Sequence, residues 1–212
     1  IILNIIIVPI VSLILLPLSL LTLIFPILDN ILYLITSILE KISLYTSNIN
    51  IFKQVLSKPS IILIIIYYLV IILILSKNKH YYLILILLIF HKTIPLYNSN
   101  LEVVMFDVGE ADSMLISTPS KKVNILIDTG RGIDINNIII YLKSIGISKL
   151  NYLIITHGDE DHIGGALYLI DNFKVDNVIL NKGDYTELEV ELITHLKNKN
   201  IKYTNNINKI PL

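Results

Sequence analysis

Residues 156–165 read Thr156-His157-Gly158-Asp159-Glu160-Asp161-His162-Ile163-Gly164-Gly165, directly behind the apolar run 152–155. Two histidines and two aspartates fall within six residues of this stretch, namely His157, Asp159, Asp161 and His162. Imidazole nitrogens and carboxylate oxygens are the lone-pair donors that divalent cations bind in proteins. The pattern therefore predicts a metal-binding loop between a strand and a helix. The alternative interpretation is a solvated acidic loop.

The segments around this loop are short and alternate in their hydrophobic periodicity. Three strands are predicted before the first helix, at 101–106, 113–118 and 123–127. A helix over 136–145 and a buried strand at 152–155 follow, and then come a helix over 163–172, a strand over 175–180, a helix over 186–199 and a strand from 201. Strands joined by crossover helices are typical of an α/β layered domain with helices outside the sheet.

Acidic residues gather at the predicted strand ends, at Asp107, Asp112 and Asp128. Ligands of α/β sheets bind beyond the carboxyl ends of the strands, so these residues are candidates for the same site. A loop that aims alternate side chains at two adjacent cations would suit water activation and phosphoryl displacement. Each aspartate also has a plainer interpretation, since aspartate is common in turns and at helix N-caps.

Other titratable residues are interpreted as structural. His80, His91 and His195 each stand alone in the sequence, which favours interface or surface positions over metal binding. Glu187, Glu189 and Glu191 alternate near a predicted helix start, where acids interact favourably with the helix dipole. We therefore expect these three glutamates to form a solvated face.

Composition divides the 212 residues into two unlike parts. All eight glycines lie at or after Gly109, and residues 1–100 carry two acids against six lysines, whereas residues 101–212 carry fifteen acids against eleven bases. The change predicts a domain boundary near residues 98–100. The absence of cysteine excludes disulfides and thiolate zinc sites. The charge balance of residues 101–212 provides no basic footprint for nucleic acid.

The first part is strongly apolar. Transmembrane spans are predicted at about 5–28, 60–76 and 81–97, with an amphipathic helix at about 30–46. A buried pair of core helices is the alternative. The basic turn 77–80 favours a cytoplasmic position, which would place residues 98 onward on the outer side.

The motifs 107–113, 127–130 and 156–165 together resemble the metallo-β-lactamase-like domain of the ComEC family, bacterial competence channels that carry DNA across the inner membrane. The resemblance implies a multi-span α-helical membrane region followed by an α/β metallo-β-lactamase-like (αββα) domain, of which residues 98–212 would be the N-terminal half. We expect the chain to be a fragment, with the remaining metal ligands beyond Leu212. The resemblance also implies that the protein is a multi-pass protein of the bacterial inner membrane.

The same resemblance assigns roles to single residues. His157 and Asp159 correspond to ligands of a first metal position, and Asp161 and His162 to ligands of a second, with Asp161 also orienting the attacking water. Asp128 corresponds to the aspartate that supports the ligand loop through hydrogen bonds to the ligands. Asp159 stands where the wider superfamily has histidine, which shifts the preference from zinc toward manganese.

We therefore expect a DNA-uptake protein that translocates single-stranded DNA and carries a metal-dependent phosphodiesterase or nuclease-like domain. Asp161 and Asp128 are its expected catalytic residues, and one or two divalent metal ions, manganese or zinc, its cofactors. Transported single-stranded DNA, membrane lipid and other competence proteins are its expected partners. Two alternatives stay open, a channel protein with a catalytically idle domain and a membrane-anchored metallohydrolase unrelated to DNA.

Overall fold

The computed structural model describes residues 7–48, 54–77 and 80–205. Its contacts divide the chain into two compact units, Ile1–Gln54 and Val55–Leu212. The boundary between these units lies ahead of the boundary that composition predicts near residues 98–100. The domain limits 1–97 and 98–212 stay a prediction.

The first unit is helical where it is described. A π-helical turn η1 (Val11–Leu15) leads into helix α2 (Leu16–Thr22), and the 3-10 turn η2 (Pro26–Leu28) leads into helix α3 (Asp29–Asn48). Pro17 explains the wide turn, because its ring carries no N–H and excludes the carbonyl four residues earlier. Helix α3 includes the range 30–46, for which the sequence predicts an amphipathic helix.

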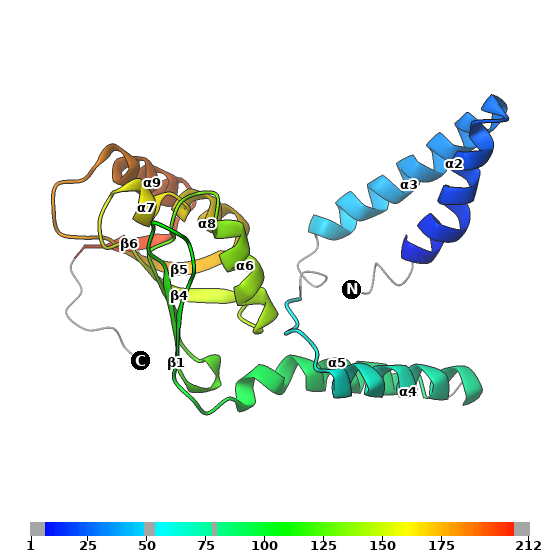
Figure 1. Cartoon of the computed structure of the whole chain (residues 1–212), viewed down its shortest axis with the longest axis horizontal. Coiled ribbons are helices and arrows are strands. Elements are labelled where there is room, and N and C mark those ends of the chain that lie inside the picture. The colour runs from blue at the N-terminus through cyan, green and yellow to red at the C-terminus, as the bar shows by residue number, and fades with distance from the viewer. Residues whose placement is uncertain (1–6, 49–53, 78–79, 206–212) are drawn as a thin grey trace. The chain divides into compact units, whose positions relative to one another are not determined.

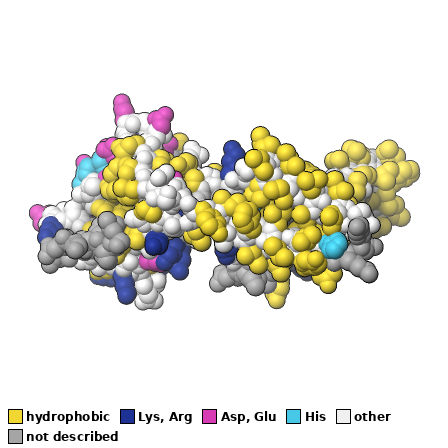
Figure 2. All heavy atoms as spheres, turned by 90° about the horizontal axis from the view of Figure 1, so that it is seen from below, with side chains coloured by type: hydrophobic (Ala, Val, Ile, Leu, Met, Phe, Trp, Pro, Cys, Tyr) yellow, Lys and Arg dark blue, Asp and Glu magenta, His cyan; other side chains and the backbone are white. Residues whose placement is uncertain are grey.

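The second unit opens with two apolar helices, α4 (Ile61–Lys77) and α5 (Tyr82–Thr93), and the 3-10 turn η4 (Ile94–Tyr97). Figure 2 shows hydrophobic side chains over much of the face that these helices present. His91 on α5 is buried: its Nε2 lies 2.9 Å from the carbonyl oxygen of Ser57 and its Nδ1 lies 3.2 Å from the hydroxyl of Tyr67. His91 therefore lies at the interface between α5 and the residues Ser57 and Tyr67 of this unit.

No helix within the described ranges is both long enough and apolar enough to cross a bilayer. The predicted spans 5–28, 60–76 and 81–97 are therefore not confirmed. The first range is interrupted by the turns η1 and η2. Helix α4 has 17 residues and α5 has 12, which at ~1.5 Å per residue cover about 26 Å and 18 Å, less than the ~30 Å of a hydrocarbon core.

The rest of the second unit is built around a six-stranded mixed sheet (Figure 1). Its strands follow the chain order, β1 (Glu102–Met105), β2 (Met114–Ser117), β3 (Asn124–Ile127), β4 (Lys149–Ile154), β5 (Lys174–Ile179) and β6 (Lys202–Thr204). The first three strands pair antiparallel, and strands β3 to β6 pair parallel. Each predicted strand is present, with ends that differ by a few residues.

Helices connect the parallel strands. Helix α6 (Ile135–Ser144) joins β3 to β4, helices α7 (Glu160–Ile163) and α8 (Ala166–Asn172) join β4 to β5, and helix α9 (Glu187–Asn198) joins β5 to β6. Each crossover leads to the next strand in the same direction across the sheet. Because such crossovers are right-handed, their helices all lie on one face of the sheet. The contacts of α8 with α6 and with α9 agree with this arrangement.

The core lies between this helical layer and the sheet. Leu126 of β3 and Leu153 of β4 have no exposed surface, and neither have Leu142 of α6, Leu169 of α8 and Leu192 of α9. Burial of such side chains stabilises the domain by roughly 1.5–3 kcal/mol each before entropy is counted. The core therefore holds the carboxyl ends of β3 and β4 side by side, and the loops that leave these ends carry the candidate site.

Candidate metal centre

Two neighbouring parallel strands and one short helix carry the residues of the predicted metal loop. Asp128 follows β3 directly, and Thr156 and His157 follow β4. Asp161 and His162 lie on α7, whose N-cap is Asp159. The apolar strands end here because the following residues are polar and the sheet places both carboxyl ends at the same edge. This is the edge at which α/β sheets bind ligands.

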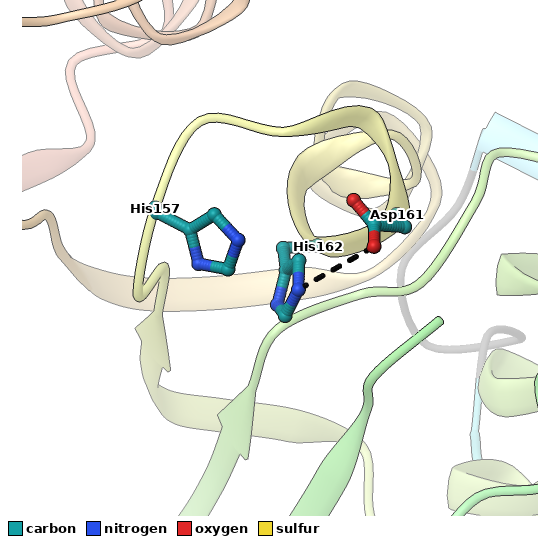
Figure 3. Close-up of side chains that lie close together, drawn as sticks. All are labelled: His157, Asp161 and His162. Atoms are coloured by element: carbon teal, nitrogen blue, oxygen red, sulfur yellow. Dashed lines mark ion pairs between the residues drawn. The ribbon is translucent and has the colours of Figure 1, made fainter. Parts of the chain in front are cut away.

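Three of the four predicted metal ligands converge. One ligand atom from each of His157, Asp161 and His162 lies within 4.8 Å of the other two, and in the described part of the chain no other histidine or acid joins a group of this kind. Figure 3 shows the two imidazole rings side by side at an angle and the carboxylate of Asp161 beside His162. Oδ2 of Asp161 lies 3.6 Å from Nε2 of His162. The ring centroids of His157 and His162 are 3.6 Å apart.

Asp128 fixes the orientation of His162. The carboxylate is 3% exposed, and its Oδ2 lies 2.9 Å from Nδ1 of His162. A carboxylate only accepts hydrogen bonds, so Nδ1 carries a proton, and in the neutral imidazole the lone pair is on Nε2, the nitrogen nearer Asp161. Oδ1 of Asp128 accepts a hydrogen bond from the backbone N–H of Thr156 at 2.8 Å, and Oδ2 of Asp128 also accepts one from the Thr156 hydroxyl at 2.6 Å. The supporting role that the resemblance to the ComEC family implies for Asp128 stays a prediction.

The backbone of Asp128 adopts a left-handed conformation, with φ of 55°. Such a conformation is uncommon outside glycine, asparagine and aspartate, and it costs free energy that the surroundings must offset. Here the N–H of Asp128 donates to the carbonyl of Ile154 at 2.8 Å, while its own carbonyl accepts from the hydroxyl of Ser113 at 3.0 Å. The residue is therefore held from both sides, and its side chain is aimed at α7.

Helix α7 is joined to the β3 loop by hydrogen bonds of the buried Thr129. Its N–H and its hydroxyl both donate to the carbonyl of His162, at 2.7 Å and 3.0 Å, and its hydroxyl accepts from the N–H of Gly165 at 3.1 Å. A side chain at Gly165 would meet Ile135 at 2.8 Å, so glycine permits this close approach. Position and direction of His162 thus follow from backbone contacts as well as from Asp128.

The other predicted acids lie outside the group formed by His157, Asp161 and His162, at different distances from it. The side chain of Asp159 is 70% exposed, and its Oδ2 lies 3.6 Å from Nε2 of His157, outside the converging group. Asp112, a candidate for the same site, comes from the loop between β1 and β2, and its Oδ2 is 3.7 Å from Nε2 of His162. Asp107 is exposed. The site therefore presents Asp112 as a further carboxylate.

One prediction about the glutamates is wrong. Glu189 is fully buried, because Thr186 and Glu189 form a reciprocal capping box at the start of α9. Its carboxylate also accepts from Asn181, and the Thr186 hydroxyl donates to the carbonyl of Gly158 at 3.1 Å. The spacing of Thr186 and Glu189 is the sequence signature of a capping box, so this signal was available. The box supports the ligand loop from behind.

With this geometry in view, three comparisons with known proteins become informative. Residues 106–203 match the family model of the metallo-beta-lactamase superfamily. ComE operon protein 3 of Bacillus subtilis (strain 168) is 33% identical over 115 residues, which cover 47% of this chain and 15% of that protein. The chain thus spans a minor part of the length of this relative.

Two crystal structures of metallo-β-lactamases are also similar. The enzyme from Hirschia baltica shares 16% sequence identity over 51% of this chain and 48% of its own, with a TM-score of 0.32. The DIM-1 metallo-β-lactamase shares 19% identity over 52% of this chain and 54% of its own, with a TM-score of 0.31. Residues 106–203 of this chain thus match the metallo-β-lactamase superfamily, and the ligand loop and the short helix α7 lie within these residues.

Proposed function

We propose that His157, Asp161 and His162 bind a divalent metal ion in a centre that hydrolyses phosphodiester bonds of DNA. The observation that carries the proposal is the convergence of these three donors within 4.8 Å. The superfamily of this domain implies divalent-metal binding. The similarity to ComE operon protein 3, together with the resemblance to the ComEC family of DNA-uptake proteins, suggests DNA as the ligand.

The donor set suits a divalent cation. His162 offers a lone pair on Nε2 because Asp128 holds the proton on Nδ1. Asp161 contributes a carboxylate that is 41% exposed, which leaves access for a substrate. Two imidazoles with a carboxylate suit zinc or manganese. When bound, such an ion would supply Lewis-acid catalysis for hydrolysis.

The residues of the chain would then divide the remaining tasks. Asp161 would orient the attacking water and accept its proton, since its carboxylate is the acidic member of the converging group. Asp128 would keep His162 in place without touching the substrate, because its carboxylate is buried and its oxygens already accept three hydrogen bonds. Asp159 would extend the site at its exposed rim.

A cleavage assay tests this function. The chain is purified in detergent micelles and incubated with Mn²⁺ or Zn²⁺ and with circular single-stranded DNA, linear duplex DNA or bis(p-nitrophenyl) phosphate. We expect cleavage of DNA that stops on chelation and falls about 100-fold or more in Asp161→Asn. Asp184→Asn, a change of an exposed residue in the loop before α9, is the matched control.

Each outcome of this assay discriminates between functions. Equal cleavage by the parent chain and by Asp161→Asn would contradict the proposed centre. Hydrolysis of the small diester without cleavage of DNA would keep a hydrolase and reject DNA as the substrate. Stoichiometric metal binding without any hydrolysis would favour a domain that is catalytically idle.

A further inference from the structure

The hydroxyl of Thr156 lies between a buried carboxylate and a candidate metal ligand. Its Oγ1 is 2.6 Å from Oδ2 of Asp128 on one side and 3.0 Å from Nδ1 of His157 on the other. Both distances are within hydrogen-bond range. The side chain therefore connects Asp128, which already contacts His162, to the second histidine of the site.

Counting protons decides the direction of both bonds. A hydroxyl has one proton to donate, whereas an ionised carboxylate has none. An oxygen–oxygen separation of 2.6 Å is that of a charge-assisted bond and requires the hydroxyl proton to lie between Thr156 and Asp128. Toward His157 the hydroxyl can then only accept. Nδ1 of His157 must then be the donor, and in the neutral ring Nε2 carries the lone pair.

The same carboxylate accepts a hydrogen bond directly from Nδ1–H of His162, at 2.9 Å. We propose that Thr156 is a positioning residue that relays the effect of Asp128 to His157, so that one buried carboxylate sets the tautomer of both histidines. In both neutral rings Nε2 is then the nitrogen left to bind a metal ion, and to this extent the inference rests on the proposed function. Which nitrogen of a ligating histidine binds the ion is set by the bond that the other nitrogen makes.

In the metal-free protein, the tautomer of His157 should differ from the one that solvent favours. In water the Nε2–H form is the more populated tautomer of a neutral histidine side chain. His157 is 46% exposed, so solvent alone would leave it in that form. The Nδ1–H form at His157 therefore depends on the hydroxyl of Thr156, whereas at His162 it depends on Asp128.

Nitrogen-15 NMR of histidine-labelled chain measures these tautomers directly. Spectra are recorded with chelator at about pH 8, where imidazole is neutral. We expect both His157 and His162 in the Nδ1–H form in the parent chain. In Thr156→Val, which replaces the hydroxyl with a methyl group, His157 should change to the Nε2–H form while His162 stays unchanged. Thr156→Ser should restore the parent pattern.

The parent spectrum alone can overturn the relay, whether or not Thr156→Val folds. His157 in the Nε2–H form in the parent chain would contradict it, and so would an unchanged Nδ1–H form in a folded Thr156→Val. A general loss of structure would instead alter His162 and the circular dichroism spectrum together with His157.

A metal titration separates this inference from the proposed function. We expect Thr156→Val to weaken Mn²⁺ or Zn²⁺ binding about 10- to 100-fold, the usual cost of losing a partner of a ligating histidine, and Thr156→Ser to weaken it little. If the tautomers behave as stated but the parent chain binds no metal, the relay stands and the proposed centre fails. If metal binds and the His157 tautomer ignores Thr156, the relay fails and the centre stands.

Discussion

Gly158 lies against the hydroxyl of Thr186, so that the ligand loop rests directly on the start of α9. The carbonyl of Gly158 accepts from this hydroxyl at 3.1 Å. A Cβ atom at Gly158 would lie 2.1 Å from Oγ1 of Thr186 and 2.5 Å from Oε2 of Glu189. A side chain between His157 and Asp159 would therefore displace Thr186 and Glu189, which form the capping box of α9.

Gly158→Ala should destabilise the chain by about 1–3 kcal/mol, because the added methyl group forces the loop and α9 apart. The midpoint of urea unfolding measures this loss. Gly183→Ala is the matched control, since a Cβ there would meet its nearest neighbour, Asn181, at 3.4 Å. Equal unfolding midpoints for the two variants would contradict the close contact.

Asp128→Asn should weaken metal binding about 10- to 100-fold. The amide supplies one acceptor oxygen for three donors, and its N–H groups would face Nδ1 of His162 and the Thr156 hydroxyl. Calorimetric titration with Zn²⁺ measures the change. Asp134→Asn, at the N-cap of α6 without a side-chain capping bond, provides the control. Unaltered affinity in Asp128→Asn would show that the ligand loop does not depend on this carboxylate.

The two aspartates of the loop should differ in their effect on metal affinity. Asp161→Asn removes the carboxylate of the converging group and should reduce affinity at least tenfold, whereas Asp159→Asn changes a side chain that is 70% exposed and outside the group. We expect a change of less than about threefold for Asp159. The same titration with Mn²⁺ measures both. A larger effect at Asp159 would favour the two-metal assignment that the sequence suggests.

Asp171 should give a weak pH dependence of stability. Hydrogen bonds from Lys199 and His195 lower the pKa of its carboxyl below the usual range. The stabilisation is therefore complete above the ordinary pKa of aspartate and is lost as the pH falls through the lower value of the folded state. Because the side chain is 45% exposed, the effect should stay below about 1 kcal/mol.

Thermal unfolding of the parent chain and of Asp171→Asn, followed between about pH 3 and pH 7, measures this term. The stability difference between the two should shrink toward acid pH. A difference that stays constant would rule out the ion pairs of Asp171 as its source. Asp184→Asn, in the exposed loop before α9, is the control for the loss of one surface charge.

Periodicity and turn residues predict most of the secondary structure. The parallel strands and the helices between them follow from apolar runs, and Gly146 follows α6 as a stop, with φ of 83°. The predicted helix over 163–172 corresponds to α8, which begins at Ala166, and a separate short helix, α7, precedes it over Glu160–Ile163. Gly164 and Gly165 lie at this break, where the chain packs closely against the loop after β3.

The spacing of residues along one helix or strand did not predict which polar side chains are buried. Glu189 was expected on a solvated face, yet it is fully buried, since the capping box and Asn181 satisfy its carboxylate. Asp112 was one of three candidate aspartates at the strand ends, and only the fold shows that its Oδ2 lies 3.7 Å from Nε2 of His162. Both results depend on which segments meet in space, and spacing along one element carries no information about that.

The sequence by itself determined the kind of chemistry and its place on the chain, because the loop 157–162 concentrates metal-binding side chains directly after a buried strand. Only the tertiary structure decided which of these side chains act together. Parallel pairing of β3 with β4 brings Asp128 to Thr156 and His162, residues 28 and 34 positions away. The tautomers of the two histidines follow from that contact, since hydrogen bonds act over about 3 Å and only folding brings these atoms so close.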